Sequence, residues 1–342
     1  MKCGIDAQLA AGTATGIGEY VRGLIPALRE IGVDLDALAF PALDPWRFDR
    51  RVLWDQVLLP LAAMRAQVRV LHCASGTMPR FASAPLVVTV HDIAWLRTQA
   101  HTRPYARAYF GAYALACYRR AAHILVDSAF SKRELIDVSD IAEDRITVAY
   151  PGVASDFTML TRRPGAAFTV LAVGTVEPRK NLVTAIRALA PLADARLISV
   201  GPLTPYSEEC RALAASLGMA DRLELRGYVD RAGLLDLYAT CSLAVMPSRY
   251  EGFGYGAAQA LCAGLPLVSS NAASLPELVQ DHGLALDPDD VAAWGAALRG
   301  IRDDRERYER AASAYRAQAA LRFGWSTCAH IVAAVYARVG QV

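Results

Sequence analysis

Lysine is scarce in this chain of 342 residues: of its 36 basic residues, only Lys2, Lys132 and Lys180 are lysines. A codon bias in a GC-rich genome, which replaces lysine by arginine, explains such a scarcity. Net charge of one sign is also lacking, since the formal value is only +2. So small an excess gives no indication of a nucleic-acid-binding protein.

Long apolar runs are absent as well. A membrane-spanning helix needs about 18 or more apolar residues in succession. The longest stretch without charge, residues 252–276, is interrupted by glycine, proline, serine and asparagine. The N-terminal segment reaches Asp6 too early for the apolar core of a signal peptide, so we expect a cytoplasmic protein.

Paired cysteines are also missing. The seven cysteines form no C-x-x-C pair, and several lie inside apolar runs. They are typical of small buried core residues in a reducing compartment. With 54% apolar and 20% charged residues, the chain is globular and not disordered. At about 150 residues per domain, its length predicts two domains.

Short apolar runs alternate with helical periods along most of the chain. The expected strands are Cys3–Ile5, Asp36–Phe40, Val68–His72, Leu86–Val90 and Ile124–Val126, then the runs FTVLAVG, ARLISVG, RLELRG, SLAVMP and LPLVSS from Phe168 onward. The expected helices are Gly18–Glu30, Tyr105–Arg120, Phe130–Val138, Leu182–Leu192, Ser207–Leu217, Leu234–Ala239 and Gly256–Ala263. This β–α alternation predicts an α/β fold with two doubly wound parallel sheets facing a cleft.

The domain boundary is expected between Ser155 and Ala167, where the segment TRRPG brings charge, proline and glycine. We assign residues 1–160 to the first domain and residues 161–325 to the second. The tail reads as successive helices, and its last helix, Ser326–Val339, could pack on either domain. Ligands of such folds lie where strands end and helices begin, so candidate functional residues should follow strands.

The segment SRYEGFGYGAAQALCAGLP, residues 248–266, carries the strongest motif. Glu251 follows the strand SLAVMP, and Gly252, Gly254 and Gly256 then lead into a helix. Glycines let a phosphate approach the backbone, and the helix N-terminus offers partial positive charge. The carboxylate is better suited to gripping hydroxyls, for example those of a sugar. The alternative is a glycine-rich turn with a surface glutamate.

The segment VGTVEPRKNL, residues 173–182, carries the second motif. Arg179 and Lys180 precede a helix for which Asn181 is a suitable N-cap. Two cations beside a helix N-terminus oppose its dipole unless an anion is present, which favours a diphosphate ligand. The alternative is a solvated surface pair.

Two weaker signals lie nearer the N-terminus. Gly16 and Gly18 belong to a glycine-rich loop before a helix, but they come about ten residues after the first strand, too late for a dinucleotide-binding G-x-G-x-x-G. His91 and Asp92 directly follow a buried strand, where His91 is either a ligand-contacting or a structural histidine.

Residues 95–123 contain no acidic residue. Arginines, among them Arg97, Arg103 and Arg107, alternate there with Trp95 and several tyrosines. A basic, aromatic helix suits an anionic membrane surface or a phosphorylated lipid acceptor. An ordinary helix packed by its aromatic face explains the pattern equally well.

Several chemistries lack their motifs, since the sequence has no H-E-x-x-H, no Cys/His ligand spacing and no G-x-S-x-G. The Asp-x-Asp at 34–36 begins an early strand and is taken as coincidence. We expect no metal and no cofactor, with cations and a helix dipole neutralising a phosphate.

These motifs, in this order, resemble glycosyltransferase family 4, the retaining group 1 glycosyltransferases with the GT-B fold. The similarity covers nearly the whole chain, and its EPRKN element is similar to a mannosyltransferase subgroup. The segments that carry it are GIGEY, RVLWDQVLLP, LHCASGTMPR, TVHDIAWL, DSAFSKREL, VGTVEPRKNL, LRGYVDRAGLLDLYATCSLAVMPSRYEGFG and SNAASLPEL.

The resemblance implies roles for matching positions. Lys180, with Arg179, would neutralise the donor diphosphate, and Glu251 would hold the donor sugar near its anomeric carbon. The N–H groups of Phe253–Tyr255 would bind phosphate or sugar hydroxyls. Residues Gly227, Tyr228 and Val229 would border the nucleobase, His91 would contact the donor sugar, and Gly16 and Gly18 would approach phosphate and acceptor. The last helix, within residues 326–342, would cross back onto the first domain.

The sequence departs from the family pattern at two positions. Gln259 occupies the second acidic position of the E-x7-E motif, where a glutamate usually grips the ribose hydroxyls, and an amide cannot accept from two hydroxyls as a carboxylate does. Thr175 occupies the place of a common arginine, whose charge Arg179 could supply.

We therefore predict a retaining, metal-independent hexosyltransferase that uses a nucleotide-sugar donor, with mannose from GDP-mannose as the first choice and UDP- or dTDP-sugars, including rhamnosyl donors, as alternatives. The acceptor would be a glycan or lipid-linked oligosaccharide in O-antigen, capsule or exopolysaccharide synthesis, at the inner membrane face. The remaining alternatives are a GT-B nucleotide-sugar epimerase or hydrolase, an NAD-dependent oxidoreductase, and a non-catalytic partner subunit.

Overall fold

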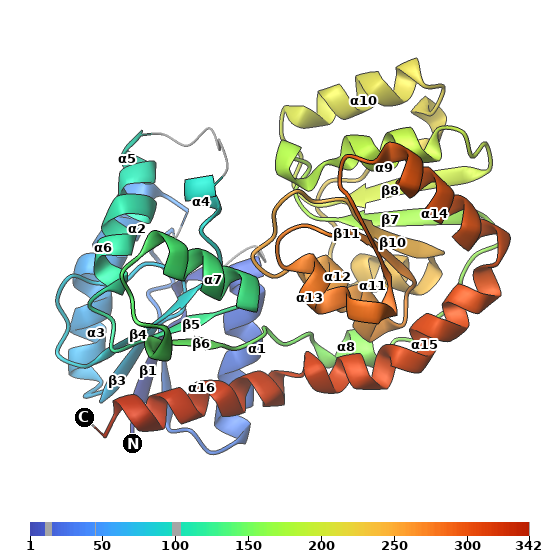
Figure 1. The fold of residues 1–342 in the computed structure, drawn as a ribbon. Helices are drawn as coiled ribbons and strands as arrows, with labels where there is room; N and C mark the ends of the chain where they lie inside the picture. The colour runs from blue at the N-terminus through green and yellow to red at the C-terminus, as the bar shows by residue number, and fades with distance from the viewer. Residues whose placement is uncertain (11–15, 45, 98–103, 342) are drawn as a thin grey trace. The chain divides into compact units, whose positions relative to one another are not determined.

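The computed structural model describes residues 1–10, 16–44, 46–97 and 104–341, and the chain divides into two compact units (Figure 1). The first unit comprises Met1–Gly152 and Gly324–Val342, and the second comprises Val153–Phe323. Each unit has one sheet with helices on both faces.

The sheet of the first unit has six parallel strands in the order β2-β1-β3-β4-β5-β6. Its strands are β1 (Cys3–Asp6), β2 (Leu35–Leu38), β3 (Val70–Cys73), β4 (Leu86–Val90), β5 (His123–Val126) and β6 (Ile146–Val148). Its α-helices are α1 (Gly16–Glu30), α2 (Phe48–Leu53), α3 (Leu59–Arg65), α4 (Ala94–Arg97), α5 (Pro104–Arg107), α6 (Ala114–Tyr118), α7 (Ala129–Val138) and α16 (Trp325–Val339).

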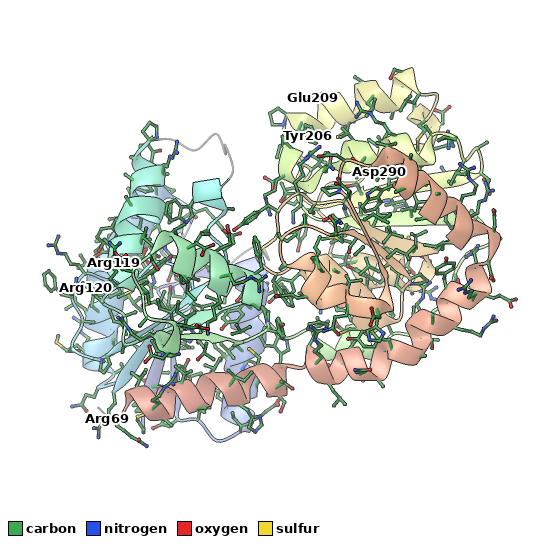
Figure 2. The ribbon with its side chains drawn as sticks, viewed as in Figure 1. Arg69, Arg119, Arg120, Tyr206, Glu209 and Asp290 are labelled. Carbon is green, nitrogen blue, oxygen red and sulfur yellow. The ribbon has the colours of Figure 1, made fainter. Side chains whose placement is uncertain are left out.

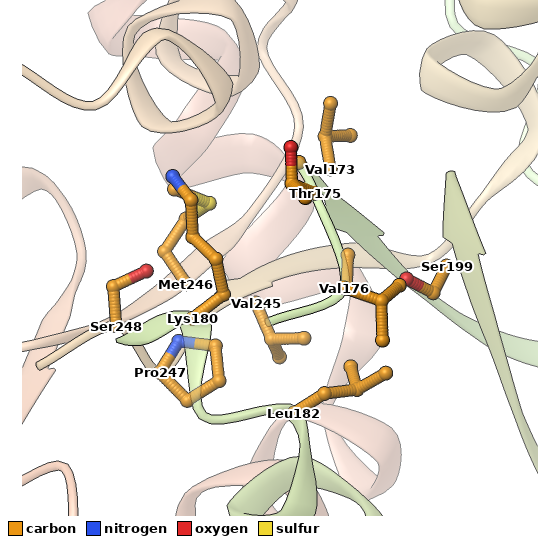
Figure 3. Close-up of a pocket in the computed structure, with 12 residues that line it drawn as sticks. Val173, Thr175, Val176, Lys180, Leu182, Ser199, Val245, Met246, Pro247 and Ser248 are labelled. Atoms are coloured by element: carbon orange, nitrogen blue, oxygen red, sulfur yellow. The ribbon is translucent and has the colours of Figure 1, made fainter. Parts of the chain in front are cut away.

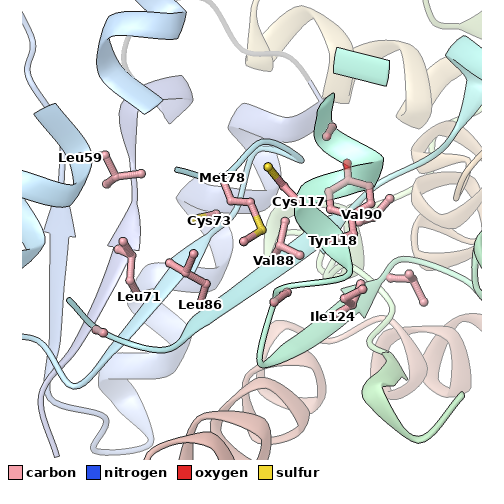
Figure 4. Close-up of a cluster of buried hydrophobic side chains, with 14 of the residues drawn as sticks. Leu59, Leu71, Cys73, Met78, Leu86, Val88, Val90, Cys117, Tyr118 and Ile124 are labelled. Carbon is pink, nitrogen blue, oxygen red and sulfur yellow. The ribbon is translucent and has the colours of Figure 1, made fainter. Parts of the chain in front are cut away.

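Apolar side chains cover both faces of this sheet, as parallel strands require. One cluster of buried side chains includes Leu71, Val88 and Ile124 and packs against α3 and α6 (Figure 4). The opposite cluster joins α1 and α16 to the sheet through residues such as Leu24 and Val332.

The start of α16 is fixed by one large side chain and two glycines. A Cβ atom on Gly23 or on Gly152 would lie 1.9 or 2.2 Å from the Trp325 ring. Neither position therefore has room for a side chain. The Trp325 ring thus packs the start of α16 closely against α1 and the segment after β6.

The sheet of the second unit has six parallel strands in the order β12-β11-β10-β7-β8-β9. Its strands are β7 (Phe168–Val173), β8 (Ala195–Val200), β9 (Leu223–Leu225), β10 (Leu243–Met246), β11 (Leu267–Ser270) and β12 (Leu284–Leu286). Its α-helices are α8 (Ser155–Thr158), α9 (Leu182–Leu189), α10 (Tyr206–Ser216), α11 (Arg231–Thr240), α12 (Tyr255–Ala263), α13 (Leu275–Val279), α14 (Val291–Asp303) and α15 (Arg305–Arg322). A core around Ile186, Leu197 and Trp294 packs under α9 and α14.

The predicted α/β class with two parallel sheets is confirmed, and so are the buried cysteines, all seven of which are free thiols in the interior. The edge strands β6 and β12 were not among the expected strands. Each is only three residues long. A run of that length gives only a weak period, and β9, which is equally short, is the one of this length that was expected.

Two expected boundaries differ from the structure. The first unit ends at Gly152 and not at residue 160, because α8 packs within the second unit: Arg231 holds both carboxylate oxygens of Asp156 at 2.7 Å, and the Phe157 ring meets Tyr238 edge-on. The expected helix Tyr105–Arg120 is divided into α5, the π-helical segment η3 (Ala108–Tyr113) and α6. No helix in the described part of the chain is long and apolar enough to cross a membrane.

Candidate functional site

Glu251 is a buried carboxylate of the second unit with several charged and polar partners. It lies in the loop between β10 and α12, and its side chain is 6% exposed. Its Oε1 accepts hydrogen bonds from Lys180 Nζ at 2.6 Å and from Ser248 Oγ at 2.7 Å. Its Oε2 lies 3.4 Å from Arg179 Nη1. The two motifs that stand 71 residues apart in the chain thus meet at one carboxylate.

Both cations have carboxylate partners. Arg179 also donates to Glu177 Oε1 at 2.7 Å and to the carbonyl oxygen of Tyr250 at 2.8 Å. Two cations therefore face two carboxylates, Glu251 and Glu177. The protein itself supplies anions that balance the two cations, so the cation pair alone does not require a bound anion, and the diphosphate ligand stays a prediction.

Charge compensation sets the ionisation of Glu251. Burial alone would raise the pKa of this carboxyl, but the charges of Lys180 and Arg179 outweigh burial and hold the pKa below its ordinary value. Glu251 is consequently a carboxylate at neutral pH, able to accept hydrogen bonds but not to donate one.

Asn181 begins α9 without capping it. Its backbone is left-handed, with φ 54°, and its side chain makes no cap hydrogen bond. The amide instead donates to the carbonyl oxygen of Pro288 at 2.8 Å. The expected N-cap interaction is therefore absent. The side chain thus joins the loop between β12 and α14 to the start of α9.

A small pocket lies beside Lys180, at the carboxyl ends of β7 and β10 (Figure 3). Thr175 and Val176 line one side, and Met246 and Ser248 line the other. A Cβ atom on Gly174, whose φ is +138°, would lie 3.4 Å from Lys180 Cε. Glycine at this position leaves room for the lysine stem against the turn that follows β7.

The loop from Gly252 to Gly254 is fixed by Ser274, whose Oγ lies within hydrogen-bond distance of the carbonyl oxygens of Glu251 and Phe253, at 3.0 and 2.7 Å. Gly254, with φ +101°, is the N-cap of α12, and a Cβ there would meet Leu275 at 2.8 Å. Phe253 packs edge-on against Tyr255. The positive end of the α12 dipole therefore begins one short loop after Glu251, at Gly254 and Tyr255.

Gln259 is turned toward α11. Its Oε1 lies 3.0 Å from the hydroxyl of Tyr238, which is fully buried. The same hydroxyl is 3.2 Å from the carbonyl oxygen of Gly256. The side-chain amide of Gln259 is thus oriented by a hydrogen bond to the buried Tyr238.

Residues Gly227, Tyr228 and Val229 follow the edge strand β9. The backbone N–H of Gly201, after β8, donates to the carbonyl oxygen of Gly227 at 2.8 Å. Tyr228 is 58% exposed. An exposed aromatic ring at the carboxyl edge of the sheet is compatible with stacking on a base, the role that the resemblance implies.

The candidates of the first unit lie at the carboxyl edge of its own sheet or near it. His91 follows β4, and both its ring nitrogens have partners: Asp127 Oδ2 at 2.7 Å and the carbonyl oxygen of Ala74 at 2.8 Å. Gly16 and Gly18 form the first turn of α1, with Gly16 exposed and Gly18 buried.

Several rings of the basic aromatic segment pack inward, while Tyr105 and Phe110 are exposed. The Trp95 ring occupies the space where Gly111 lacks a side chain, and the Tyr109 and Tyr113 hydroxyls bond to Asp55 and Gln56. Arg107 is exposed. Arg119 and Arg120, at the end of the same segment, also lie on the surface (Figure 2). The alternative of an ordinary helix packed by its aromatic face is therefore favoured for these rings. Arg103 lies outside the described residues, as does the side chain of Arg97.

Among the described residues, no group of three His, Cys, Asp or Glu side chains is placed to hold a metal ion. In the Asp-x-Asp segment, Asp36 pairs with Lys2 at 3.0 Å.

Two family models match the chain, and together they span most of it. One, described as Glycosyltransferase Family 4, matches residues 14–157. The other, described as Glycosyl transferases group 1, matches residues 161–318. The chain belongs to the group 1 glycosyltransferases of family 4.

The relatives of this glycosyltransferase include proteins with named activities. The O-antigen chain mannosyltransferase B of Escherichia coli is 33% identical over 224 residues, which cover 60% of this chain and 58% of that protein. The D-inositol 3-phosphate glycosyltransferase of Acidothermus cellulolyticus is 30% identical over 297 residues, which cover 77% of this chain and 64% of that protein. The chain thus aligns with less than two thirds of the length of either relative.

Among solved structures, the Anabaena protein HepE in complex with UDP-glucose has a TM-score of 0.76 over 99% of this chain and all of that one. At 19% identity, this likeness supports the fold alone.

Several residues of the sites were not predicted. Ser248 and Glu177 bind the Glu251 cluster, Tyr238 orients Gln259, and Asp127 binds His91. Asp127 directly follows β5, so the rule that functional residues follow strands could have found it. Tyr238 lies in the last turn of α11, and nothing in the sequence marks it.

Proposed function

We propose that the chain transfers a hexosyl group from a nucleoside-diphosphate sugar to a hydroxyl of a glycan or lipid-linked acceptor. The observation that carries the proposal is the cluster of Lys180, Arg179 and Glu251 at the carboxyl ends of β7 and β10, one short loop before the N-terminus of α12. Cations, a helix dipole and a carboxylate are what a diphosphate joined to a polyhydroxyl ring requires.

The diphosphate would bind at Lys180 and Arg179 in competition with Glu251. A diphosphate carries more negative charge than one carboxylate, so it can draw the two cations away. Glu251, held by Ser248, would then accept hydrogen bonds from hydroxyls of the donor sugar. Departure of the diphosphate builds negative charge that the two cations and the α12 dipole stabilise, with no metal ion required.

Retention of configuration is part of the proposal. The acceptor hydroxyl attacks the anomeric carbon from the face that the diphosphate leaves. The bond from the anomeric carbon to the phosphate oxygen breaks, the new bond to the acceptor oxygen forms, and the phosphate takes the acceptor proton. The family to which the chain belongs is the support for this route.

Mannose from GDP-mannose is the proposed donor, since a mannosyltransferase for O-antigen is among the relatives. UDP- and dTDP-sugars remain alternatives, because HepE binds UDP-glucose and Gln259 replaces an acidic residue of the family pattern. Thermal-shift measurements with GDP-, UDP- and dTDP-sugars decide between these donors.

The proposed pathway is cell-surface polysaccharide synthesis on the cytoplasmic membrane face, where Arg103 and Arg107 would meet anionic lipid. Replacing both with glutamate should release the protein from anionic vesicles, measured by co-sedimentation. Unchanged binding would refute the proposed membrane contact without affecting the proposed transfer reaction.

The test of the transfer reaction is substitution of Lys180 and Glu251 by alanine, assayed with the donor that gives the largest thermal shift. We expect each variant to lose about 10²- to 10³-fold in kcat/KM, as losses of single charge-stabilising groups do. Lys132→Ala is the matched control, because Lys132 pairs with Glu143 in the first unit. Near wild-type transfer by both site variants would refute the assignment.

A further inference from the structure

The ring of His91 is enclosed by two acceptors. Its Nε2 lies 2.8 Å from the carbonyl oxygen of Ala74, and its Nδ1 lies 2.7 Å from Asp127 Oδ2. A carbonyl oxygen can only accept, so Nε2 carries a proton. Any charge on the ring then depends on where the proton between Nδ1 and Asp127 resides.

The surroundings favour the proton on the ring. An imidazole in water holds a proton more firmly than a carboxylate by about 2.6 pKa units. The Ala74 carbonyl and the nearby Asp92 both stabilise the cationic ring. Burial alone would lower the pKa of His91, but the Asp127 charge, its hydrogen bond and these neighbours outweigh burial and place the pKa above its ordinary value.

The orientation of the ring is fixed from further inside the unit. Tyr20 of α1 meets the His91 ring edge-on at 5.0 Å. The Tyr20 hydroxyl lies 3.2 Å from Thr89 Oγ1, which is 2.7 Å from His72 Nε2, and His72 Nδ1 is 2.6 Å from the Tyr336 hydroxyl on α16. All four side chains are buried. The ring therefore has a rigid neighbour on the side of α1.

We propose that Asp127 is a positioning residue that keeps His91 as an imidazolium ion with both N–H groups turned into the first unit. Of the two roles that the sequence left open for His91, this arrangement favours the structural one, because both ring nitrogens are engaged within the first unit. The residue holds the loops after β3, β4 and β5 together, and what remains toward a ligand is a fixed positive ring without a donor.

The titration of His91 depends on the titratable groups that face its ring. Asp127 comes from the segment after β5, Asp92 from its own loop, Tyr20 from α1 and His72 from β3. Burial, with repulsion from His91, lowers the pKa of His72 to about 3, so His72 stays neutral. Burial raises the pKa of the Asp127 carboxyl, and the His91 charge opposes this. His91 is then the group whose charge Asp127 controls.

The decisive experiment is a pH titration of the full chain labelled with ¹³C-histidine, following the Cε1–Hε1 signals by NMR between pH 5 and 9. The His91 signal is assigned by its loss in His91→Gln. In the wild type we expect this signal to stay at the imidazolium position through pH 7, where a histidine peptide in the same buffer titrates near ~6.5. In Asp127→Asn we expect the midpoint to fall by about one unit or more.

Three further variants separate positioning from folding. Asp127→Glu should return the midpoint toward the wild type, because it restores the charge. Asp92→Asn, which removes a carboxylate without a hydrogen bond to the ring, should move the midpoint less than Asp127→Asn does. Asp140→Asn, at a carboxylate that is 95% exposed, should not move it. Titration of wild-type His91 near ~6.5, or an unchanged midpoint in Asp127→Asn, would overturn the proposal.

Activity supplies an independent readout, which rests on the proposed function. The wild-type kcat/KM should show no inflection from His91 between pH 6 and 8. Asp127→Asn should lose activity as the pH rises through its lowered midpoint, by at least about 10-fold at pH 8 relative to the wild type, because His91 there becomes neutral. If neither protein transfers sugar, the NMR titration still decides the role of Asp127, so failure of the proposed function is distinguishable from failure of this inference.

Discussion

Replacing Glu251 by glutamine should make the second unit less stable and yet make it bind nucleoside diphosphate more tightly. The substitution keeps the shape of the side chain and removes its charge. Lys180 then loses its partner at 2.6 Å, while Arg179 keeps Glu177 at 2.7 Å and the Tyr250 carbonyl. The two effects have opposite signs because one carboxylate both stabilises the empty site and competes with the ligand.

The stability cost follows from burial. Breaking a fully buried ion pair costs about 3–5 kcal/mol. The Lys180 side chain is 20% exposed and can be rehydrated, so we expect about 2 kcal/mol. For a unit of this size each kcal/mol corresponds to about 2–4 °C, and the melting temperature should fall by roughly 4–8 °C. Differential scanning calorimetry measures this directly.

The gain in affinity follows from the same contact. A charge-assisted hydrogen bond contributes about 1.5–3 kcal/mol, less at a partly exposed lysine, and the ligand no longer has to displace it. We expect the Kd for free nucleoside diphosphate, measured by calorimetric titration, to fall about 5- to 30-fold in Glu251→Gln. Transfer should still be lost, since the amide cannot accept from two sugar hydroxyls as the carboxylate does. Weaker nucleotide binding, as expected for Lys180→Ala, would show that Glu251 does not compete for the cations.

Three other outcomes follow from the structure. Gly23→Ala should destabilise the first unit by about 1–3 kcal/mol in thermal unfolding, because its Cβ would overlap the Trp325 ring, and Gly300→Ala, a helical glycine of α14 whose Cβ would lie 3.9 Å from the Tyr308 hydroxyl, is a control without that overlap. His72 is neutral when folded, with a pKa of about 3, and takes a proton when unfolded, so stability should fall by up to ~1.4 kcal/mol per unit as the pH drops from ~6.5 toward 3, and His72→Gln should flatten this slope in denaturant titrations. Gln259→Glu places a carboxylate 3.0 Å from the buried Tyr238 hydroxyl, and it should increase affinity for the ribose-bearing part of the donor without changing binding of inorganic pyrophosphate.

The α/β fold follows from the sequence because strands buried on both faces leave continuous apolar runs, and helices between them leave a 3.6-residue period. Most of the expected strands lie within two residues of the observed ones. The edge strands β6 and β12 and the division at η3 were not predictable in this way. A three-residue strand gives only a weak period, which indicated β9 but not β6 or β12. The contacts that Tyr109 and Tyr113 of η3 make with Asp55 and Gln56 span more than 50 residues, and a local pattern does not contain them.

The residue types of the candidate site could be predicted from the sequence, but the contacts between those residues could not. Glycines and charged residues after strands indicated where Glu251, Lys180 and His91 lie along the chain. The sequence could not indicate that Lys180 and Arg179 share Glu251, because contacts across 71 residues depend on the order of β7 and β10 in the sheet. It also could not indicate that both nitrogens of His91 are occupied, since one partner is a backbone carbonyl, which every residue has.

The pairing of Lys180 with Glu251 bears on how such a site could distinguish a complete donor from a free phosphate. In the empty site the lysine charge is balanced by a carboxylate that is itself fixed by Ser248. A phosphate that draws Lys180 away leaves the Glu251 carboxylate buried and uncompensated, which is costly unless another donor reaches it. Hydroxyls of a sugar joined to that phosphate supply such donors, whereas inorganic phosphate does not. When Lys180 moves from Glu251 to the phosphate, recognition of the diphosphate would therefore be coupled to recognition of the sugar. A compact ammonium group, with three donors and no fixed plane, suits this change of partner better than the arginine that the chain uses elsewhere.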